Sequence, residues 1–205
     1  MKKTFLAIIA VALLCGCTGK GTFSMVEPVP VPVDLDNLGD TTLPASFTAQ
    51  DFNWRGSLLT LSLYTEDVYD AREVASLRKG DTLVFSGNRI VVKDLKWEEG
   101  FLTVNGGIEQ GGAYLQKRDE DIWRSCLMDD HSVYHKVGSV GLLLDEDFTI
   151  TDCGAEPTDP ILTVETGQKA YIDDLPEYKK TFSELDTKVQ IKDGRIVSIN
   201  RRWIP

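Results

Sequence analysis

The chain has 205 residues, of which 42% are hydrophobic, and a formal net charge of −10. This apolar content is enough to bury one core, so one main globular domain is expected. A chain this acidic repels phosphate backbones, which excludes nucleic acid as an expected partner.

The first residues resemble a bacterial lipoprotein signal peptide. Two lysines precede a short apolar run at residues 5–14, which is too short to span a bilayer stably. Residues 14–17, LCGC, then match a lipobox, with leucine at −3 and a small residue at −1 before the acylated cysteine. We predict that residues 1–16 are removed as the signal peptide and that Cys17 carries a lipid. An ordinary secreted chain cut nearby is the alternative.

The predicted location is the bacterial cell envelope, as a membrane-anchored lipoprotein that is either periplasmic or surface-facing. Removing residues 1–16 changes the net charge from −10 to −12, because the segment holds two lysines and no acidic residue. This charge gives no attraction to an anionic membrane, so the membrane is a partner only through the lipid on Cys17. Residues 17–45 contain a Pro-Val run at 28–33 and are predicted to be the lipid anchor and an extended tether.

Two further cysteines, Cys126 and Cys153, remain after processing. They are an even pair in a compartment that permits disulfides. A disulfide between them and two separate buried thiols are the alternatives.

Residues 46–205 have the pattern of a small β-rich domain. Residues 58–64 alternate between apolar and polar side chains, which predicts a strand with one face in water. A capping-box spacing predicts a short helix at residues 71–77. Three short apolar runs, separated by glycine-containing turns, then predict a β-meander. These runs are residues 82–85, 90–92 and 101–104.

Further along, residues 121–128 and 133–144 are predicted to pair as a hairpin. Apolar residues at helical spacing predict an amphipathic helix at residues 175–185. Asp193-Gly194, between two alternating segments, is a type I′ hairpin signal. The expected fold is therefore mainly β: a single antiparallel β-barrel or β-sandwich domain with one short and one amphipathic helix.

The run of residues 68–152 resembles a group of uncharacterised bacterial lipoproteins and secreted β-domain proteins. Most of the motifs that carry the resemblance are turn motifs, and the group has no activity attached to it. The resemblance therefore supports the envelope location and implies no site residue. The motifs are VYDA at 68–71, LRKGDT at 77–82, VNGG at 104–107, GG at 111–112, MDDH at 128–131 and FTITD at 148–152.

The two histidines of the chain, His131 and His135, are four residues apart. On a helix this spacing would suit a metal ion, but on the predicted strand it separates the side chains by about 13 Å. Asp129, Asp130 and His131 are therefore only weak metal candidates. The sequence predicts no metal site and no cofactor.

Nucleophilic catalysis needs a nucleophile, a base within reach and an orienting group. Cys126 sits in an alternating run that favours a buried sulfur, and GSVG at residues 138–141 is not the GxSxG motif. We therefore predict no catalytic residue and a non-catalytic binding or interaction domain, whose ligand is an envelope protein, a peptide or a glycan. The alternative is an envelope hydrolase or metal-dependent enzyme that uses His131 and Asp130.

Overall fold

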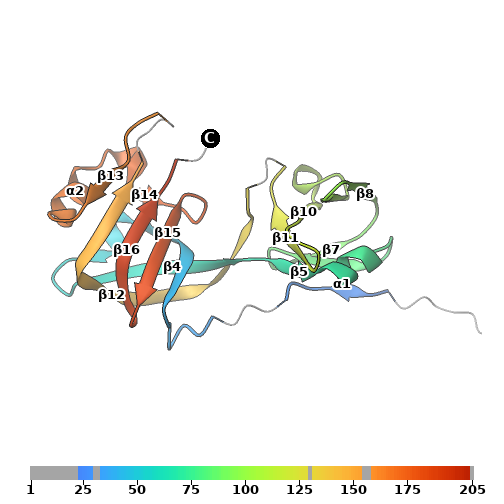
Figure 1. The fold of residues 1–205 in the computed structure, drawn as a ribbon, viewed down its shortest axis with the longest axis horizontal. Helices are drawn as coiled ribbons and strands as arrows, with labels where there is room; N and C mark the ends of the chain where they lie inside the picture. The colour runs from blue at the N-terminus through green and yellow to red at the C-terminus, as the bar shows by residue number, and fades with distance from the viewer. Residues whose placement is uncertain (1–22, 30–32, 129–130, 154–157, 204–205) are drawn as a thin grey trace, which may run out of the picture.

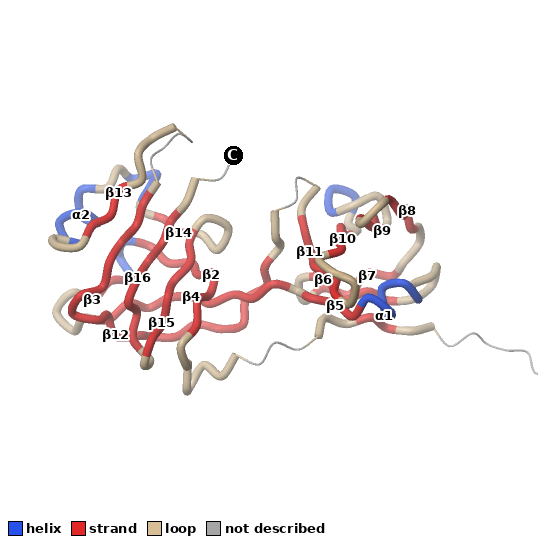
Figure 2. Tube along the Cα trace, viewed as in Figure 1, coloured by secondary structure: helices blue, strands red, loops and turns tan. Residues whose placement is uncertain are grey.

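The computed structural model describes residues 23–29, 33–128, 131–153 and 158–203. Its fold is mainly β, which confirms the predicted fold class. Figure 1 shows two lobes joined by extended chain, and Figure 2 shows that strands dominate both. Each lobe has a hydrophobic core of its own. The globular part, expected as one domain over residues 46–205, is thus built around two cores.

The larger lobe is a closed barrel of five strands. The pairing runs β2–β4–β12–β16–β15 and returns to β2, and only the β12–β16 pair is parallel. In chain order the ring is therefore 1-2-3-5-4-1, which is the connectivity of an OB-fold barrel. A barrel, and not a sandwich, is what the strands form. They are β2 (Thr41–Thr48), β4 (Leu58–Glu66), β12 (Tyr134–Asp152), β15 (Thr187–Lys192) and β16 (Arg195–Arg201).

The length and irregularity of β12 close the barrel. Its first half pairs with β4, and its second half pairs with β16, with a register shift between Leu144 and Thr149. A second shift, between Lys136 and Gly138, interrupts the pairing with β4. Such bulges bend a strand and increase its twist, so one strand can wrap around two sides of the barrel. The predicted alternation in β4 is confirmed, because its leucines at 59, 61 and 63 are buried in the core.

Short elements decorate the barrel. The second helix, α2, spans Gln168–Asp174, so the prediction of a helix at residues 175–185 is wrong. Leu175 has an extended conformation (φ −58°, ψ 137°), as expected for the residue before Pro176, and this ends the helix. The other elements are η1 (Ala49–Asp51), β3 (Phe52–Asn53), β13 (Leu162–Val164), η3 (Glu177–Lys179) and β14 (Thr181–Phe182).

A buried ion pair ties the end of the barrel wall to the segment before β15. The Arg201 guanidinium donates to both carboxylate oxygens of Asp152, and its Nη1 donates to the carbonyl of Lys179 at 2.6 Å. Tyr171 of α2 donates its hydroxyl to the same carboxylate. The guanidinium also lies over the ring of Phe182, 4.2 Å from its centroid.

The smaller lobe is an insertion between β4 and β12, the second and third strands of the barrel. It contains a five-stranded antiparallel sheet, in the order β5-β11-β10-β9-β8, and the hairpin β6–β7. The short helix predicted at residues 71–77 is confirmed as α1. The elements are β5 (Val68–Asp70), α1 (Ala71–Ser76), β6 (Thr82–Phe85), β7 (Asn88–Val91), β8 (Leu95–Glu98), β9 (Phe101–Val104), η2 (Ile108–Gln110), β10 (Ala113–Lys117) and β11 (Ile122–Cys126).

Two predicted pairings are wrong. The predicted meander strands exist, but β7 does not continue to β9, because β8 intervenes and pairs with β9 in a different sheet. The predicted hairpin between residues 121–128 and 133–144 also fails: β11 pairs with β10 and β5, while β12 pairs with β4. Near the expected turn, an isolated antiparallel bridge pairs Cys126 with Ser132, and Val133 donates its N–H to the Ser125 carbonyl at 3.4 Å.

The expected tether also differs from the structure. Within residues 17–45, β1 (Met25–Val26) pairs in parallel with β6, and β2 already begins at Thr41. Val26 is buried in the core of the smaller lobe. Extended chain favoured by proline is compatible with edge-strand pairing, so the same pattern that predicted a tether also permits a docked strand.

Candidate functional site

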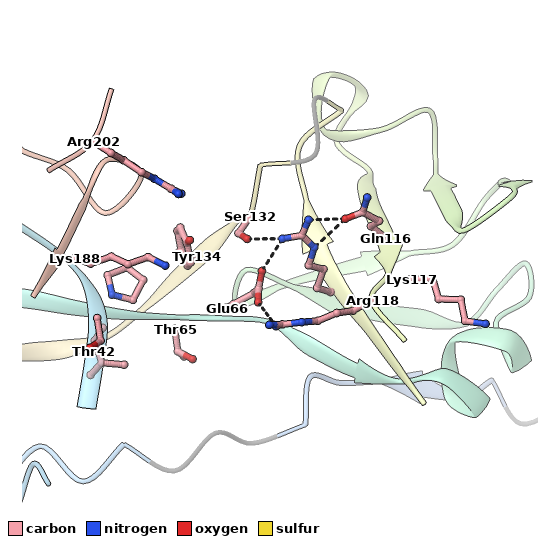
Figure 3. Close-up of a pocket in the computed structure, with 13 residues that line it drawn as sticks. Thr42, Thr65, Glu66, Gln116, Lys117, Arg118, Ser132, Tyr134, Lys188 and Arg202 are labelled. Atoms are coloured by element: carbon pink, nitrogen blue, oxygen red, sulfur yellow. Dashed lines mark hydrogen bonds and ion pairs between the residues drawn. The ribbon is translucent and has the colours of Figure 1, made fainter. Parts of the chain in front are cut away.

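A groove of about 640 Å³ lies between the two lobes. Figure 3 shows its walls: β2, β4, β12 and β15 of the barrel on one side, and β10 and β11 of the insertion on the other. Because the insertion begins and ends on the barrel at Glu66 and Tyr134, side chains of both lobes converge there. The lining is mostly polar, with hydroxyl groups from Thr42, Thr65 and Ser132 among them.

The groove carries a strong excess of positive charge. Five of its lining residues are basic and one, Glu66, is acidic, although the whole chain has a net charge of −10. In Figure 3 Lys188 and Arg202 extend from the barrel toward the opposite wall, while Lys117 points away from the barrel. The basic residues are Lys117, Arg118, Arg124, Lys188 and Arg202.

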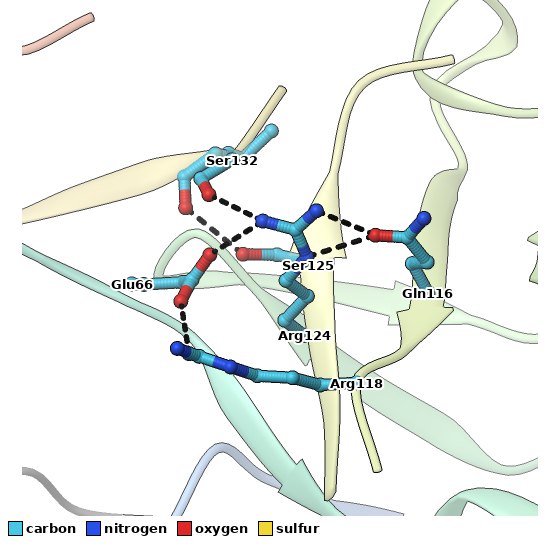
Figure 4. Close-up of polar contacts among 7 residues, drawn as sticks. Glu66, Gln116, Arg118, Arg124, Ser125 and Ser132 are labelled. Carbon is cyan, nitrogen blue, oxygen red and sulfur yellow. Dashed lines mark hydrogen bonds and ion pairs between the residues drawn. The ribbon is translucent and has the colours of Figure 1, made fainter. Parts of the chain in front are cut away.

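Arg124 is the most tightly positioned of these cations. Its Nε and Nη2 donate to the side-chain oxygen of Gln116 at 2.9 and 2.6 Å, and its Nη1 donates to Ser132 Oγ at 2.8 Å. Nη1 also lies 3.5 Å from Glu66 Oε1. Figure 4 shows the contacts of Arg124 with Gln116 on one side and with Ser132 and Glu66 on the other. The guanidinium is thereby held in one orientation, with 21% of the side chain exposed.

One carboxylate is shared by two arginines. Glu66 Oε2 accepts from Arg118 at 3.3 Å, while Oε1 faces Arg124. Among the described residues, no acidic group lies within ion-pair distance of Lys188 or Arg202. The groove therefore keeps cationic groups that can pair with an anion brought by a ligand.

A second pocket, of about 300 Å³, lies where Val29 passes the smaller lobe. There His135 Nδ1 lies 2.5 Å from Asp67 Oδ1, although the angle is not that of a hydrogen bond. The buried Asp67 also accepts from the backbone N–H of Ser86 at 2.6 Å and from Tyr69 at 3.3 Å. Burial, and then the charge of Asp67, raise the pKa of the Tyr69 hydroxyl, so Tyr69 stays protonated as a donor.

Of the weak metal candidates, only His131 lies among the described residues. Asp129 and Asp130 lie outside the described residues, and His131 is half-buried, with its backbone carbonyl accepting from Leu127 at 2.7 Å. Across the described part of the chain, no group of three or more His, Cys, Asp or Glu side chains is placed to hold a metal ion. In that same part, neither helix is long and apolar enough to cross a membrane.

The predicted disulfide is not formed in the structure. Cys126 ends β11 in the smaller lobe, whereas Cys153 follows β12 at the far end of the barrel wall, and no bond joins them. A disulfide would need the strands that end near these cysteines to be neighbours, whereas β12 pairs with β4 and β16. Burial, and then the nearby charge of Asp152, raise the pKa of the Cys153 thiol.

Sequence reasoning missed the groove. Its cations come from three separate stretches, residues 117–124, 188 and 202, and no spacing rule connects them. The basic pairs Lys117-Arg118 and Arg201-Arg202 are only a weak signal, because Arg78-Lys79 and Lys179-Lys180 are also basic pairs and lie outside the groove. The topology, and not a motif, brings them together.

No family model, curated protein or solved structure matches this chain.

Proposed function

We propose that the protein is a lipid-anchored, non-catalytic binding protein of the bacterial cell envelope, and that the groove between its lobes binds an acidic glycan. The observation that carries this proposal is the cationic lining of the groove in an otherwise acidic chain. Charge of the opposite sign to the rest of the surface focuses anionic ligands into one place.

The polar groups of the groove favour a glycan over other anions. Hydroxyl and amide groups from Thr42, Thr65, Gln116 and Ser132 supply hydrogen-bond partners for sugar hydroxyls. Apolar lining is limited to Leu43, Pro44 and the ring of Tyr134, so there are few pockets for peptide side chains. A single ring offers little stacking for nucleic-acid bases.

The architecture is consistent with this ligand class. OB-fold barrels bind oligosaccharides and oligonucleotides on the face of their second and third strands. In this protein those strands are β4 and β12, and both contribute to the groove. Because a fold does not by itself imply a function, the charge of the groove carries the argument and the fold only supports it.

Calorimetric titration with oligogalacturonate, heparin oligosaccharide and neutral dextran tests the proposal. We expect binding of at least one acidic glycan, weakening as salt rises, and no binding of dextran. The double variant Lys188→Glu/Arg202→Glu should lower the affinity about tenfold, since two favourable charges are reversed. Lys192→Glu, on the same strand but outside the groove, should bind like wild type.

Three outcomes would refute the groove proposal. These are equal binding of dextran, unchanged affinity in the double variant, or preferential binding of polyglutamate or oligo-dT over both acidic glycans. The last outcome would assign the groove to a peptide or a nucleic acid.

The anchor has its own test. The lipobox-like residues 14–17 support lipidation of Cys17. Cys17→Ser should move the protein from the membrane fraction to the soluble fraction of cells. Retention in the membrane fraction after a salt wash would contradict the lipid anchor.

A hydrolase is the competing function, and the paired His135 and Asp67 beside a pocket favour it over the His131 region. A buried carboxylate against an imidazole nitrogen orients a general base. If this pair acts in hydrolysis, His135→Gln should abolish turnover of esters or glycosides while the melting temperature changes little. Absence of turnover by wild-type protein across such a panel would argue against it.

A further inference from the structure

The sheet β1–β6–β7 has an apolar outer face. Paired positions in neighbouring strands place their side chains on the same side of a sheet. Met25 pairs with Thr82, and Thr82 pairs with Val91, so these three side chains form one row. The opposite face, with Val26 and Leu83, is buried in the core of the smaller lobe.

This outer row is open to solvent. Met25 is 47% exposed and Val91 is 55% exposed. Phe23, 73% exposed, extends the row, because its ring lies against Gly80 so closely that a Cβ there would sit 2.1 Å from the ring. A sheet with one face in water normally carries polar residues on that face. An apolar outer face therefore indicates a contact surface.

Basic side chains border this face. Arg78 and Lys79 are exposed in the turn that leads to Gly80, and Arg89 is exposed on β7. Glu27, which follows β1, and Asp94, which follows β7, are exposed acidic residues near the same strands, and Lys93 beside Asp94 is a further exposed base. An apolar surface with a mostly basic rim is the combination that suits the boundary between acyl chains and anionic headgroups.

The position of the face in the chain indicates its partner. Cys17 lies six residues before Phe23. Six extended residues reach at most about 20 Å, so a lipid on Cys17 would hold this face close to the bilayer. In Figure 1 β1 lies along the edge of the smaller lobe, beside α1 and remote from the barrel strands.

We propose that the outer face of β1–β6–β7, formed by Phe23, Met25, Thr82 and Val91, docks onto the membrane that carries the lipid. This inference rests on the proposed lipid anchor. Docking adds a second point of attachment, and two points fix the orientation of the protein on the membrane. The smaller lobe then faces the bilayer, and the barrel is held away from it.

Thiol accessibility tests the docking. The variants Val91→Cys and Thr163→Cys place a thiol on the outer face and, as a matched control, on exposed strand β13 of the barrel. The full lipidated protein is reconstituted in vesicles of phosphatidylethanolamine and phosphatidylglycerol and reacted with a charged maleimide. Peptide mass spectrometry then identifies the labelled cysteine. The reference is the same variant carrying Cys17→Ser, free in solution.

We expect the thiol at position 91 to react about fivefold or more slowly on vesicles than in solution, because headgroups cover it. The thiol at position 163 should react at the same rate in both. Adding Phe23→Ser and Met25→Ser should restore fast labelling at position 91. Equal rates at position 91 on vesicles and in solution would overturn the docking.

Other outcomes are distinguishable. Slow labelling at position 91 without vesicles, together with a dimer in sedimentation, would mean that a second copy covers the face, which overturns the proposal. If Cys17→Ser protein stays in the membrane fraction of cells, the lipid anchor fails. Labelling of that lipid-free chain with added vesicles then decides the docking alone, by the same fivefold criterion.

Discussion

Replacing Arg201 by methionine should strongly destabilise the barrel. The side chains of Arg201 and Asp152 are 6% and 2% exposed, so the carboxylate would lose its counter-charge in a nearly water-free site. Arg201→Met also removes the hydrogen bond to the Lys179 carbonyl and the contact with the Phe182 ring. Breaking one side of a buried ion pair costs about 3–5 kcal/mol, and we expect a loss in that range.

Urea unfolding at pH 7, followed by circular dichroism, measures the loss. A double variant, Asp152→Leu/Arg201→Met, removes both charges. It therefore separates the free-energy cost of an unpaired buried carboxylate from the cost of lost packing. Buried pairs replaced by apolar side chains are often neutral or stabilising, so the double variant should be more stable than Arg201→Met alone. A loss below about 1 kcal/mol in Arg201→Met, or a double variant that loses the sum of the single changes, would refute this reasoning.

The same pair sets a pH dependence. Burial alone would raise the pKa of Asp152, but hydrogen bonds from Arg201 and Tyr171 and the charges of Arg201 and Lys179 outweigh it, so the pKa lies below 3.8. A carboxyl whose pKa is lower in the folded state contributes stability above its unfolded pKa and loses it as pH falls through the folded pKa. Wild-type protein should therefore lose stability below about pH 4, and this component should vanish in the double variant.

Four further substitutions probe the smaller lobe and the C-terminal hairpin. Asn105→Ala removes two hydrogen bonds accepted from the N–H groups of residues 93 and 94 and one donated to the carbonyl of residue 91, so the free energy of unfolding should fall by about 2 kcal/mol. Asn88→Ala, which removes one bond, should cost less in the same urea titration; equal losses would contradict the role of Asn105. Gly194→Val should cost about 1–2 kcal/mol through backbone strain at φ +71°, and an unchanged melting temperature would count against it. Asp81→Ala removes the carboxylate that accepts from the N–H groups of residues 24 and 78, so limited proteolysis near β1 should become faster than in wild type, and equal cleavage rates would show that other contacts hold β1.

Local features of the fold were predictable from the sequence. The alternation in residues 58–64 predicted β4 because one face of that strand is buried and the other is wet. Asp193-Gly194 predicted a type I′ turn, and both residues have the positive φ that this turn needs, 48° and 71°. The capping-box spacing that begins at Asp70 predicted α1. The Asp70 side chain accepts hydrogen bonds from the backbone N–H groups of Arg72 and Glu73 in the first turn of this helix.

Non-local pairing was not predictable in the same way. Residues 121–128 and 133–144 looked like a hairpin because they are adjacent in sequence, whereas β12 finds its partner β4 across the whole insertion. The apolar spacing of residues 175–185 favours a helix there, but Pro176 keeps Leu175 extended, so the helix ends before this segment. The groove depends on the pairing of β12 with β4, since it exists only where the insertion meets the barrel.

Glu66 and Tyr134 are directly paired, so the smaller lobe leaves the barrel and rejoins it at one point of the wall. A tight turn could replace everything between them. Closing a loop of about 67 residues rather than a turn of four costs about 2.5 kcal/mol in chain entropy, which such a deletion would recover. Different insertions could therefore replace the smaller lobe at this junction. Each would supply its own groove wall opposite the barrel and its own ligand preference, while the core of the barrel stays unchanged.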